Sequence, residues 1–236
     1  MGGFGYDAAV LDRFPATVGG VVHAVGLANG PSDDALRTAF DNEQETVRAE
    51  IGNTPLAELP TLAAWRRTFS AFGVKPTQYR SAPEALLRRL TKQGDVPSIN
   101  RLVDIANLVS IRHRLPVAVF DQAPVTGPTT VRFSTGSEHF TDLGSGSESP
   151  PEPGEVIFVD DADLVSARRW CWRQSAQSAA GPATTEAVIT IEAQHEGGNE
   201  AVAGALADLM TLLDEYQVEA TARSDLLTAA HPSFDF

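Results

Sequence analysis

The stretch from Val96 to Asp121 decides how this chain folds. It reads Val-Pro-Ser-Ile-Asn at residues 96–100, Arg-Leu-Val-Asp-Ile-Ala-Asn-Leu-Val-Ser-Ile-Arg-His-Arg at 101–114 and Leu-Pro-Val-Ala-Val-Phe-Asp at 115–121. Asn100 predicts a helix start, because its side-chain oxygen can accept a hydrogen bond from a free N–H of the first turn. Pro116 predicts the helix end, because proline disfavours the α conformation at the residue before it. A short buried strand is expected directly afterwards, at residues 117–120.

Apolar residues cover nearly the whole circumference of this predicted helix. One stripe has helical spacing and consists of Leu102, Ile105, Ala106 and Val109. Three further apolar residues lie beside this stripe, namely Val103, Leu108 and Ile111. A helix that is apolar nearly all round is buried on several sides. A narrow polar strip interrupts it at Asp104, Asn107 and Ser110, each about one turn from the last.

Burial rules leave two interpretations of this polar strip. Buried polar groups need hydrogen-bond partners, so Asp104 and Asn107 can be ties between the helix and a neighbouring loop. Alternatively, Asn107 faces a pocket, where its amide offers both a donor and an acceptor to a ligand. The sequence pattern alone does not separate the two.

Length and composition restrict the class of protein. The 236 residues are enough for one large domain or two small ones, and the single cysteine excludes an intrachain disulfide. No apolar run approaches the roughly 20 residues that span a membrane. The first residues also lack the basic start and apolar core of a signal peptide. We therefore expect a cytoplasmic protein.

The charge of the chain is unevenly distributed. The net charge of −13 argues against a protein that coats nucleic acid by bulk electrostatics. Residues 65–114, however, contain ten basic side chains and only three acidic ones. Such a basic region can steer a phosphate backbone to one part of an acidic protein. The alternative, a set of solvated helix faces, is the commoner outcome for charge runs.

Patterning along the chain predicts a mixed α/β fold of the α+β kind. We expect strands at residues 20–27, 117–120, 156–159, 164–167 and 185–193, and helices at 33–51, 60–72, 82–92, 101–114 and 200–216. Ser32 is expected to cap one helix, and Ser81 another through a capping box with Glu84. Residues 131–134 and 139–143 are expected to form a hairpin. We divide the chain into an N-terminal strand and helix of the same fold (1–59), a main domain (60–220) and a C-terminal tail (221–236).

A second informative stretch is Arg168–Ser175, which reads Arg-Arg-Trp-Cys-Trp-Arg-Gln-Ser. Tryptophans beside guanidinium groups suit a planar or carboxylate-bearing ligand, through stacking and bidentate hydrogen bonds. The alternative is a core edge with arginine stems packed across it. Cys171 has no identifiable partner base, so we do not assign it as a nucleophile. The five histidines stand singly, which predicts no metal site, and we find no cofactor-binding motif.

The run Pro97–Val109, with Leu115–Pro116 and Phe120–Asp121, resembles the B3/4 editing module of the bacterial phenylalanyl-tRNA synthetase beta subunit. The similarity continues through Glu155–Asp160 and Thr184–Val188 and covers roughly residues 60–195. It is strongest to free-standing proteins of this family, in which Arg-Trp-Cys-Trp-Arg replaces a glycine-rich segment. The resemblance implies the editing-domain fold, a sheet-rich core with flanking helices. It also implies hydrolysis, in trans, of the ester between a wrong amino acid and tRNA.

The resemblance further implies roles for particular residues. Asn107 would be the catalytic residue, holding the substrate amine or ester beside a placed water, so that neither a covalent nucleophile nor a cofactor is required. The substrate-binding residues would be Ser98, Asn100, Ala118, Arg169, Trp170, Trp172, Arg173 and Ser175. The tRNA-binding residues would be Arg66, Arg67, Arg88, Arg89 and Arg101.

This chain departs from the synthetase pattern at the expected site. Ala106 stands where the pattern has a threonine, and Ala118 where it has a histidine. The glutamate that reads the tyrosine hydroxyl in the synthetases falls in the segment replaced here by Trp-Cys-Trp-Arg-Gln-Ser. The amino acid that is recognised is therefore open. Two other classes remain as alternatives, a non-catalytic module that binds an amino acid or small ligand, and a protein-interaction domain.

Overall fold

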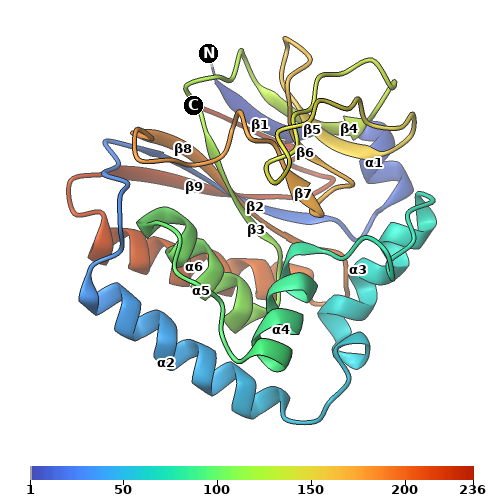
Figure 1. The fold of residues 1–236 in the computed structure, drawn as a ribbon. Coiled ribbons are helices and arrows are strands. Elements are labelled where there is room, and N and C mark those ends of the chain that lie inside the picture. The colour runs from blue at the N-terminus through green and yellow to red at the C-terminus, as the bar shows by residue number, and fades with distance from the viewer. Residues whose placement is uncertain (1) are drawn as a thin grey trace.

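Two β-sheets and a layer of helices make up the computed structural model, which describes residues 2–236 (Figure 1). In chain order the elements are β1 (Gly3–Tyr6), α1 (Ala8–Arg13), β2 (Val18–Val25), α2 (Asp34–Ile51), a 3-10 helix (Leu56–Glu58), α3 (Pro60–Ala71), α4 (Ala82–Gln93), α5 (Arg101–His113), β3 (Val117–Asp121), β4 (Thr129–Phe133), β5 (Val156–Val159), β6 (Val165–Arg168), β7 (Arg173–Gln174), β8 (Glu186–Ala193), α6 (Gly198–Tyr216), β9 (Thr221–Leu227) and β10 (Ser233–Asp235). No helix in the described part of the chain is long and apolar enough to cross a lipid bilayer.

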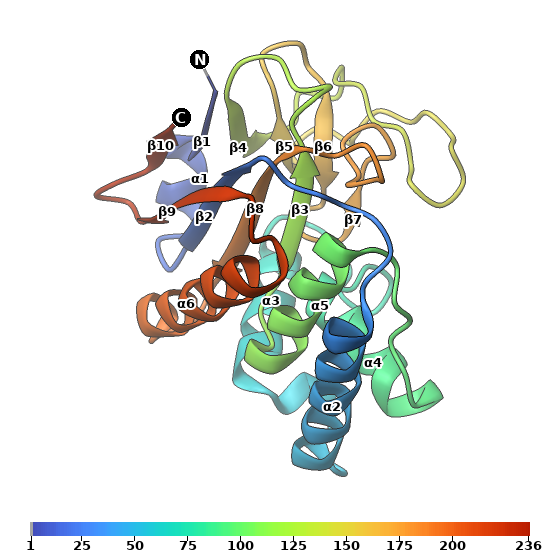
Figure 2. The same ribbon diagram turned by 90° about the vertical axis from the view of Figure 1, so that its left-hand side faces the viewer.

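The two sheets differ in size and in strand direction. The smaller sheet has the order β3-β8-β2-β9 and is antiparallel throughout. The larger sheet has the order β10-β1-β4-β5-β6-β7, in which β1 and β4 run parallel. Helices α5 and α6 lie on one side of the smaller sheet, and the larger sheet lies on the side away from them (Figure 2).

Each face of the smaller sheet closes a separate hydrophobic core. Side chains alternate along β8, so that Ile189 and Ile191 pack against the helices whereas Val188 packs between the sheets. The core between the sheets is aromatic, and its fully buried rings are Phe4, Trp65, Phe69, Phe120, Phe158 and Trp170. The expectation of an α/β (α+β) fold, with a sheet-rich core and flanking helices, is confirmed.

Helix α5 is buried as its sequence predicts, and it positions the chain on either side of it. Asn100 is the N-cap, since its side chain accepts a hydrogen bond from the Val103 N–H at 3.0 Å. Near the other end, the Ser110 hydroxyl donates to the Leu115 carbonyl at 2.7 Å. These two bonds determine where the helix begins and how the chain leaves it toward β3.

The polar strip on α5 divides into a structural part and an open part. Asp104 is fully buried and accepts hydrogen bonds from the Ile99 N–H at 2.8 Å and from the hydroxyls of Ser32 and Ser98. It therefore ties two separate loops to the helix. Asn107 is half-buried, and its side chain hydrogen-bonds to none of residues 2–236.

Two helix caps differ from the sequence prediction. Asp33, not Ser32, caps α2 through its side chain, because the Ser32 hydroxyl is bound to Asp104. The predicted capping box of α4 is also wrong. Ser81 makes no side-chain cap hydrogen bond, and Glu84 instead pairs with Arg66 at 2.6 Å.

The predicted hairpin of residues 131–134 and 139–143 is wrong. Strand β4 pairs with β1 and β5, and His139 makes only an isolated bridge to Leu164. The reason lies in Glu138, whose carboxylate accepts hydrogen bonds from the Ser134 hydroxyl at 2.6 Å and the Thr135 N–H at 2.8 Å. These bonds fold the segment back on itself, so it cannot continue as a second strand.

Both ends of the described chain join the sheets. Residues 221–236, expected to be a tail, contribute β9 beside β2 and β10 beside β1. Strand β1, which the sequence pattern does not predict, lies between β10 and β4. Its four residues are too few to show a periodic pattern, and its partners are distant in sequence.

The Asp104 network provides a stability test. We expect Asp104→Ala to lower the free energy of unfolding by about 2–4 kcal/mol, because it leaves buried donors without an acceptor. Urea unfolding would measure the loss. The exposed Asp214→Ala on α6 is the control and should change stability by less than about 0.5 kcal/mol. Equal effects of the two variants would contradict a stabilising role for the hydrogen bonds of Asp104.

Candidate functional site

A cavity of about 80 Å³ lies between the two sheets, beside the segment that follows β6. We call it the inner cavity. Most of its wall is apolar, with contributions from Ala82, Pro116, Val117, Ala118, Phe120, Phe158, Ala167 and Trp170. The polar residues that line it include Cys171, Thr190 and Glu192. An apolar cavity with a few placed polar groups is the usual form of a small-molecule site.

The Glu192 carboxylate is the buried charge of the inner cavity. The Tyr6 hydroxyl and the Trp170 indole N–H both donate to its Oε1 atom, each at 2.8 Å. The hydrogen bonds of the Glu192 side chain to residues 2–236 all go to Oε1, and Oε2 has no partner among these residues. Burial raises the pKa of Glu192 to about 7, although the hydrogen bonds from Trp170 and Tyr6 act in the opposite direction.

Glycine at position 19 allows Tyr6 to reach this carboxylate. Gly19 lies opposite Glu192 in the pairing of β2 with β8. A Cβ atom at Gly19 would lie 2.3 Å from the Tyr6 hydroxyl oxygen, which is far inside van der Waals contact. The close approach of the tyrosine to the sheet therefore requires a residue without a side chain.

An open groove of about 380 Å³ adjoins the inner cavity, and we call it the outer groove. The two hollows share residues Ala82, Val117, Ala118, Trp172, Arg173 and Gln174. Helix α5 forms another part of the groove through Val103, Ala106 and Asn107. The Asn107 amide is thus free to bind a molecule in the groove.

A third hollow of about 330 Å³ continues from the outer groove along α4, and we call it the basic groove. Its lining contains five cationic side chains and no carboxylate, the cations being Arg80, Arg88, Arg89, Lys92 and Arg173. Trp172 and Arg173 line all three hollows, so the hollows form one continuous site.

An unusual turn places Trp172 at the centre of this site. Arg169 and Trp170 both have left-handed backbone conformations, with φ of 46° and 61°. Non-glycine residues adopt this conformation rarely, and a consecutive pair is unusual. The Arg169 guanidinium stacks over the rings of Tyr79 at 3.9 Å and Trp172 at 4.7 Å and pairs with Glu155 at 2.9 Å. These contacts hold the turn in its strained form.

The structure brings half of the predicted site residues into the three hollows. These are Asn107, Ala118, Trp170, Trp172, Arg173, Arg88 and Arg89. The other predicted residues lie outside the linings, namely Ser98, Asn100, Arg169, Ser175, Arg66, Arg67 and Arg101.

Several of the residues outside the linings have structural partners. Ser98 binds Asp104, and Asn100 caps α5 while donating to the Ala180 carbonyl at 3.0 Å. Arg66 pairs with Glu84. Arg101 donates to the Ala28 carbonyl at 3.2 Å. The guanidinium of Arg101, six residues before Asn107, is therefore partly bound to the backbone of another loop.

Sequence reasoning missed three residues that shape the inner cavity: Tyr6, Thr190 and Glu192. The latter two alternate along β8, a pattern that is typical of the solvent face of a strand. The structure buries both because the larger sheet covers that face. An acidic residue near the end of a strongly apolar strand was the available signal. Tyr6 had none, since its strand was not predicted.

Cys171 lines the inner cavity but is not an activated thiol. Burial raises the pKa of the Cys171 thiol well above its usual range, and the neighbouring Glu192 acts in the same direction. The thiolate is the nucleophilic form of cysteine. Cys171 is therefore neutral near pH 7, which agrees with leaving it unassigned.

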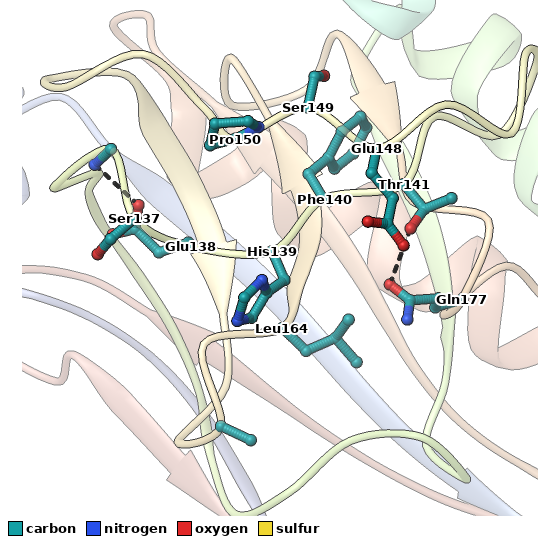
Figure 3. A pocket seen from close by; sticks show the side chains of 12 residues that line it. Ser137, Glu138, His139, Phe140, Thr141, Glu148, Ser149, Pro150, Leu164 and Gln177 are labelled. Atoms are coloured by element: carbon teal, nitrogen blue, oxygen red, sulfur yellow. Dashed lines mark hydrogen bonds between the residues drawn. The ribbon is translucent and has the colours of Figure 1, made fainter.

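A larger hollow, of about 770 Å³, lies elsewhere (Figure 3). It is a shallow polar surface between the 136–150 segment and Gln177, with Thr141 and Glu148 at the Gln177 end. Its buried carboxylate, Glu138, already binds Ser134, Thr135 and Arg132. The buried charge of this hollow is therefore already paired within the protein.

The part of the chain that forms most of this site is similar to known proteins. A family model described as the B3/4 domain matches residues 64–201, more than half of the chain. The chain belongs to the B3/4 domain family. The matched region contains α5, the Arg169–Arg173 turn and Glu192, and hence most of the lining of the three hollows.

Relatives of this B3/4 protein include two phenylalanine–tRNA ligase beta subunits. The subunit of Shewanella oneidensis is 32% identical over 89 residues, which are 38% of this chain and 11% of the relative. That of Cereibacter sphaeroides is 32% identical over 98 residues, or 42% of this chain and 12% of the relative. This chain thus corresponds to a small part of either subunit.

A solved structure is also similar to this B3/4 protein. It is an N-terminal fragment of the phenylalanyl-tRNA synthetase beta subunit from Pyrococcus horikoshii, with a TM-score of 0.48 and 14% sequence identity. The match covers 94% of this chain and 50% of that chain.

The buried carboxylate predicts a pH dependence of stability. Because the pKa of Glu192 is raised on folding, the folded protein binds a proton more tightly than the unfolded chain, and stability falls as the pH rises toward 7. Glu192→Gln keeps the shape and the acceptor but does not titrate. We expect its advantage over wild type to grow by about 2.5 kcal/mol between pH 5 and pH 8, measured by urea unfolding.

The matched control for this experiment is Glu196→Gln, at an exposed position three residues after the end of β8. Its free energy of unfolding should follow the wild-type pH profile. A constant difference between Glu192→Gln and wild type from pH 5 to pH 8 would contradict a raised pKa.

Proposed function

We propose that this B3/4 protein is a cytoplasmic aminoacyl-tRNA deacylase that acts in trans on mischarged tRNA. The observation that carries the proposal is the continuity of the inner cavity, the outer groove and the basic groove through Trp172 and Arg173. The 3′ end of an aminoacyl-tRNA presents the same order of groups: a side chain, an ester on a ribose, and phosphates. The relation to tRNA ligase subunits supports this assignment.

Each hollow has the chemistry of one part of that substrate. The mainly apolar inner cavity takes the amino-acid side chain. The outer groove takes the ester and the terminal ribose, with the ring of Trp172 as a stacking surface. The basic groove takes the phosphates, since Arg88 and Lys92 offer positive charge there. Arg89 adds to this charge and also pairs with Asp95 at 3.3 Å.

In this mechanism the protein acts by positioning. The Asn107 amide holds the substrate amine or the ester oxygen, so that a water in the groove approaches the carbonyl carbon. The terminal ribose hydroxyl and backbone groups assist the proton transfer. No covalent nucleophile is required, and the neutral Cys171 thiol does not supply one.

Deacylation of a panel of mischarged tRNAs by the purified protein tests this function. We expect turnover on at least one pair, and a loss of about 100-fold in kcat/KM for Asn107→Ala, because a mispositioned substrate reacts that much more slowly. Asn199→Ala, at an exposed position on α6, is the control and should retain activity. A complete absence of hydrolysis by a folded protein would exclude the deacylase.

The basic groove makes a separate prediction. The double variant Arg88→Ala/Arg89→Ala should weaken tRNA binding and reduce the slope of log affinity against log salt by about 1.4, since roughly 0.7 is lost for each single-strand phosphate contact. Binding titrations at several salt concentrations would measure both effects. The control is Arg37→Ala, an exposed arginine on α2. An unchanged slope would favour a binding module for a free amino acid over a tRNA editor.

A further inference from the structure

The inner cavity is smaller than a protein cavity that is known to hold an aromatic ring. Its volume is about 80 Å³. An apolar protein cavity that holds benzene has about 150 Å³, almost twice as much. The fully buried rings of Phe120, Phe158 and Trp170 form its inner wall, whereas Trp172, Arg173 and Gln174 line its opening to the outer groove. The cavity therefore favours a short side chain over an aromatic ring.

The inner cavity also contains an unused hydrogen-bonding atom. Tyr6 and Trp170 occupy Oε1 of Glu192, and they leave Oε2 without a partner among the described residues. Glu192 is 2% exposed and belongs to the cavity lining. A purely aliphatic side chain would exclude water from this oxygen without donating a hydrogen bond to it. An acceptor that loses its hydrogen bonds in this way costs free energy.

We propose that the inner cavity selects an amino acid whose short side chain carries a hydroxyl, and that Glu192 Oε2 binds that hydroxyl. Threonine is the natural amino acid that combines this size with a hydroxyl and a methyl group for the apolar wall. The inference rests on the proposed function, because it concerns the substrate of that same site. It makes Glu192 a specificity-determining residue that contacts the substrate side chain, distinct from Asn107 in the outer groove.

The proposed preference does not depend on the protonation state of Glu192. A hydroxyl can donate to the ionised carboxylate, and it can accept from the protonated acid. Valine has the shape of threonine but lacks the hydroxyl, so it would leave Oε2 unpaired in both states. Sites built to bind a hydroxyl discriminate strongly against the analogue that lacks it. The comparison of threonine with valine therefore isolates this one hydrogen bond.

The test uses the full chain and stable amide analogues of the acceptor end, 3′-aminoacylamino-3′-deoxyadenosines that carry threonine, valine or phenylalanine. Isothermal titration calorimetry should show at least tenfold tighter binding of the threonyl than of the valyl analogue. The phenylalanyl analogue should bind no better than the valyl one. A threonyl-to-valyl ratio below threefold, or tightest binding of the phenylalanyl analogue, would overturn the proposal.

Two variants connect the preference to Glu192. Glu192→Met has a similar size and no hydrogen-bonding head, so the threonyl-to-valyl ratio should fall to about 1. Glu192→Gln retains a polar head that can bind a hydroxyl, and its ratio should stay within about threefold of wild type. If Glu192→Met does not fold, as judged by its thermal unfolding transition, the wild-type ratio decides. Equal ratios in wild type and folded Glu192→Met would refute the role of Glu192.

Hydrolysis of threonyl-, valyl- and phenylalanyl-tRNA, each on the same tRNA body, separates this proposal from the proposed function. Cleavage of all three at similar kcat/KM would support the deacylase and overturn the selectivity. Selective binding of the threonyl analogue without cleavage of any ester would support the selectivity and overturn the deacylase. Preferential cleavage of threonyl-tRNA would support both.

Discussion

The structure depends on one buried carboxylate oxygen. Glu192 on β8 belongs to the smaller sheet. Its Oε1 atom accepts hydrogen bonds from Tyr6 on β1 and from Trp170, which follows β6, and so links the smaller sheet to the larger one at two places. Each such bond to an ionised group contributes about 1.5–3 kcal/mol. Because both donors bind the same oxygen, Glu192 joins the two sheets and leaves its other oxygen without a partner among the described residues. The same residue thus joins the two layers and gives the cavity its polarity.

A similar division of roles occurs on α5. Asp104 is buried and binds the loops at Ser32 and Ser98, whereas Asn107, one turn further along, has no partner among the described residues and lines the outer groove. The helix is held rigidly by one polar residue so that the next is presented in a defined position. A group on a rigid element is better suited to orient a substrate than a group on a loop.

The turn at Arg169 and Trp170 connects these features. Its left-handed backbone places Trp170 in the core and Trp172 and Arg173 at the junction of the three hollows. Large side chains occupy this turn, and two of them, Trp170 and Trp172, line the inner cavity. The strained turn therefore shapes the cavity wall.

Local sequence patterns were enough to predict the elements with strong periodicity, including α5 with its Asn100 cap and the strand β8, as well as the family to which the chain belongs. They also indicated Asn107 and the Trp172 segment as candidate site residues, because these residue types are unusual in their local patterns. The remaining features depend on contacts between segments that are distant in sequence. Strand β1 and the terminal strands depend on partners far away in sequence, and Glu192 reads locally as a solvent-facing residue. Its burial, its partners and its free oxygen arise only when the second sheet covers that face.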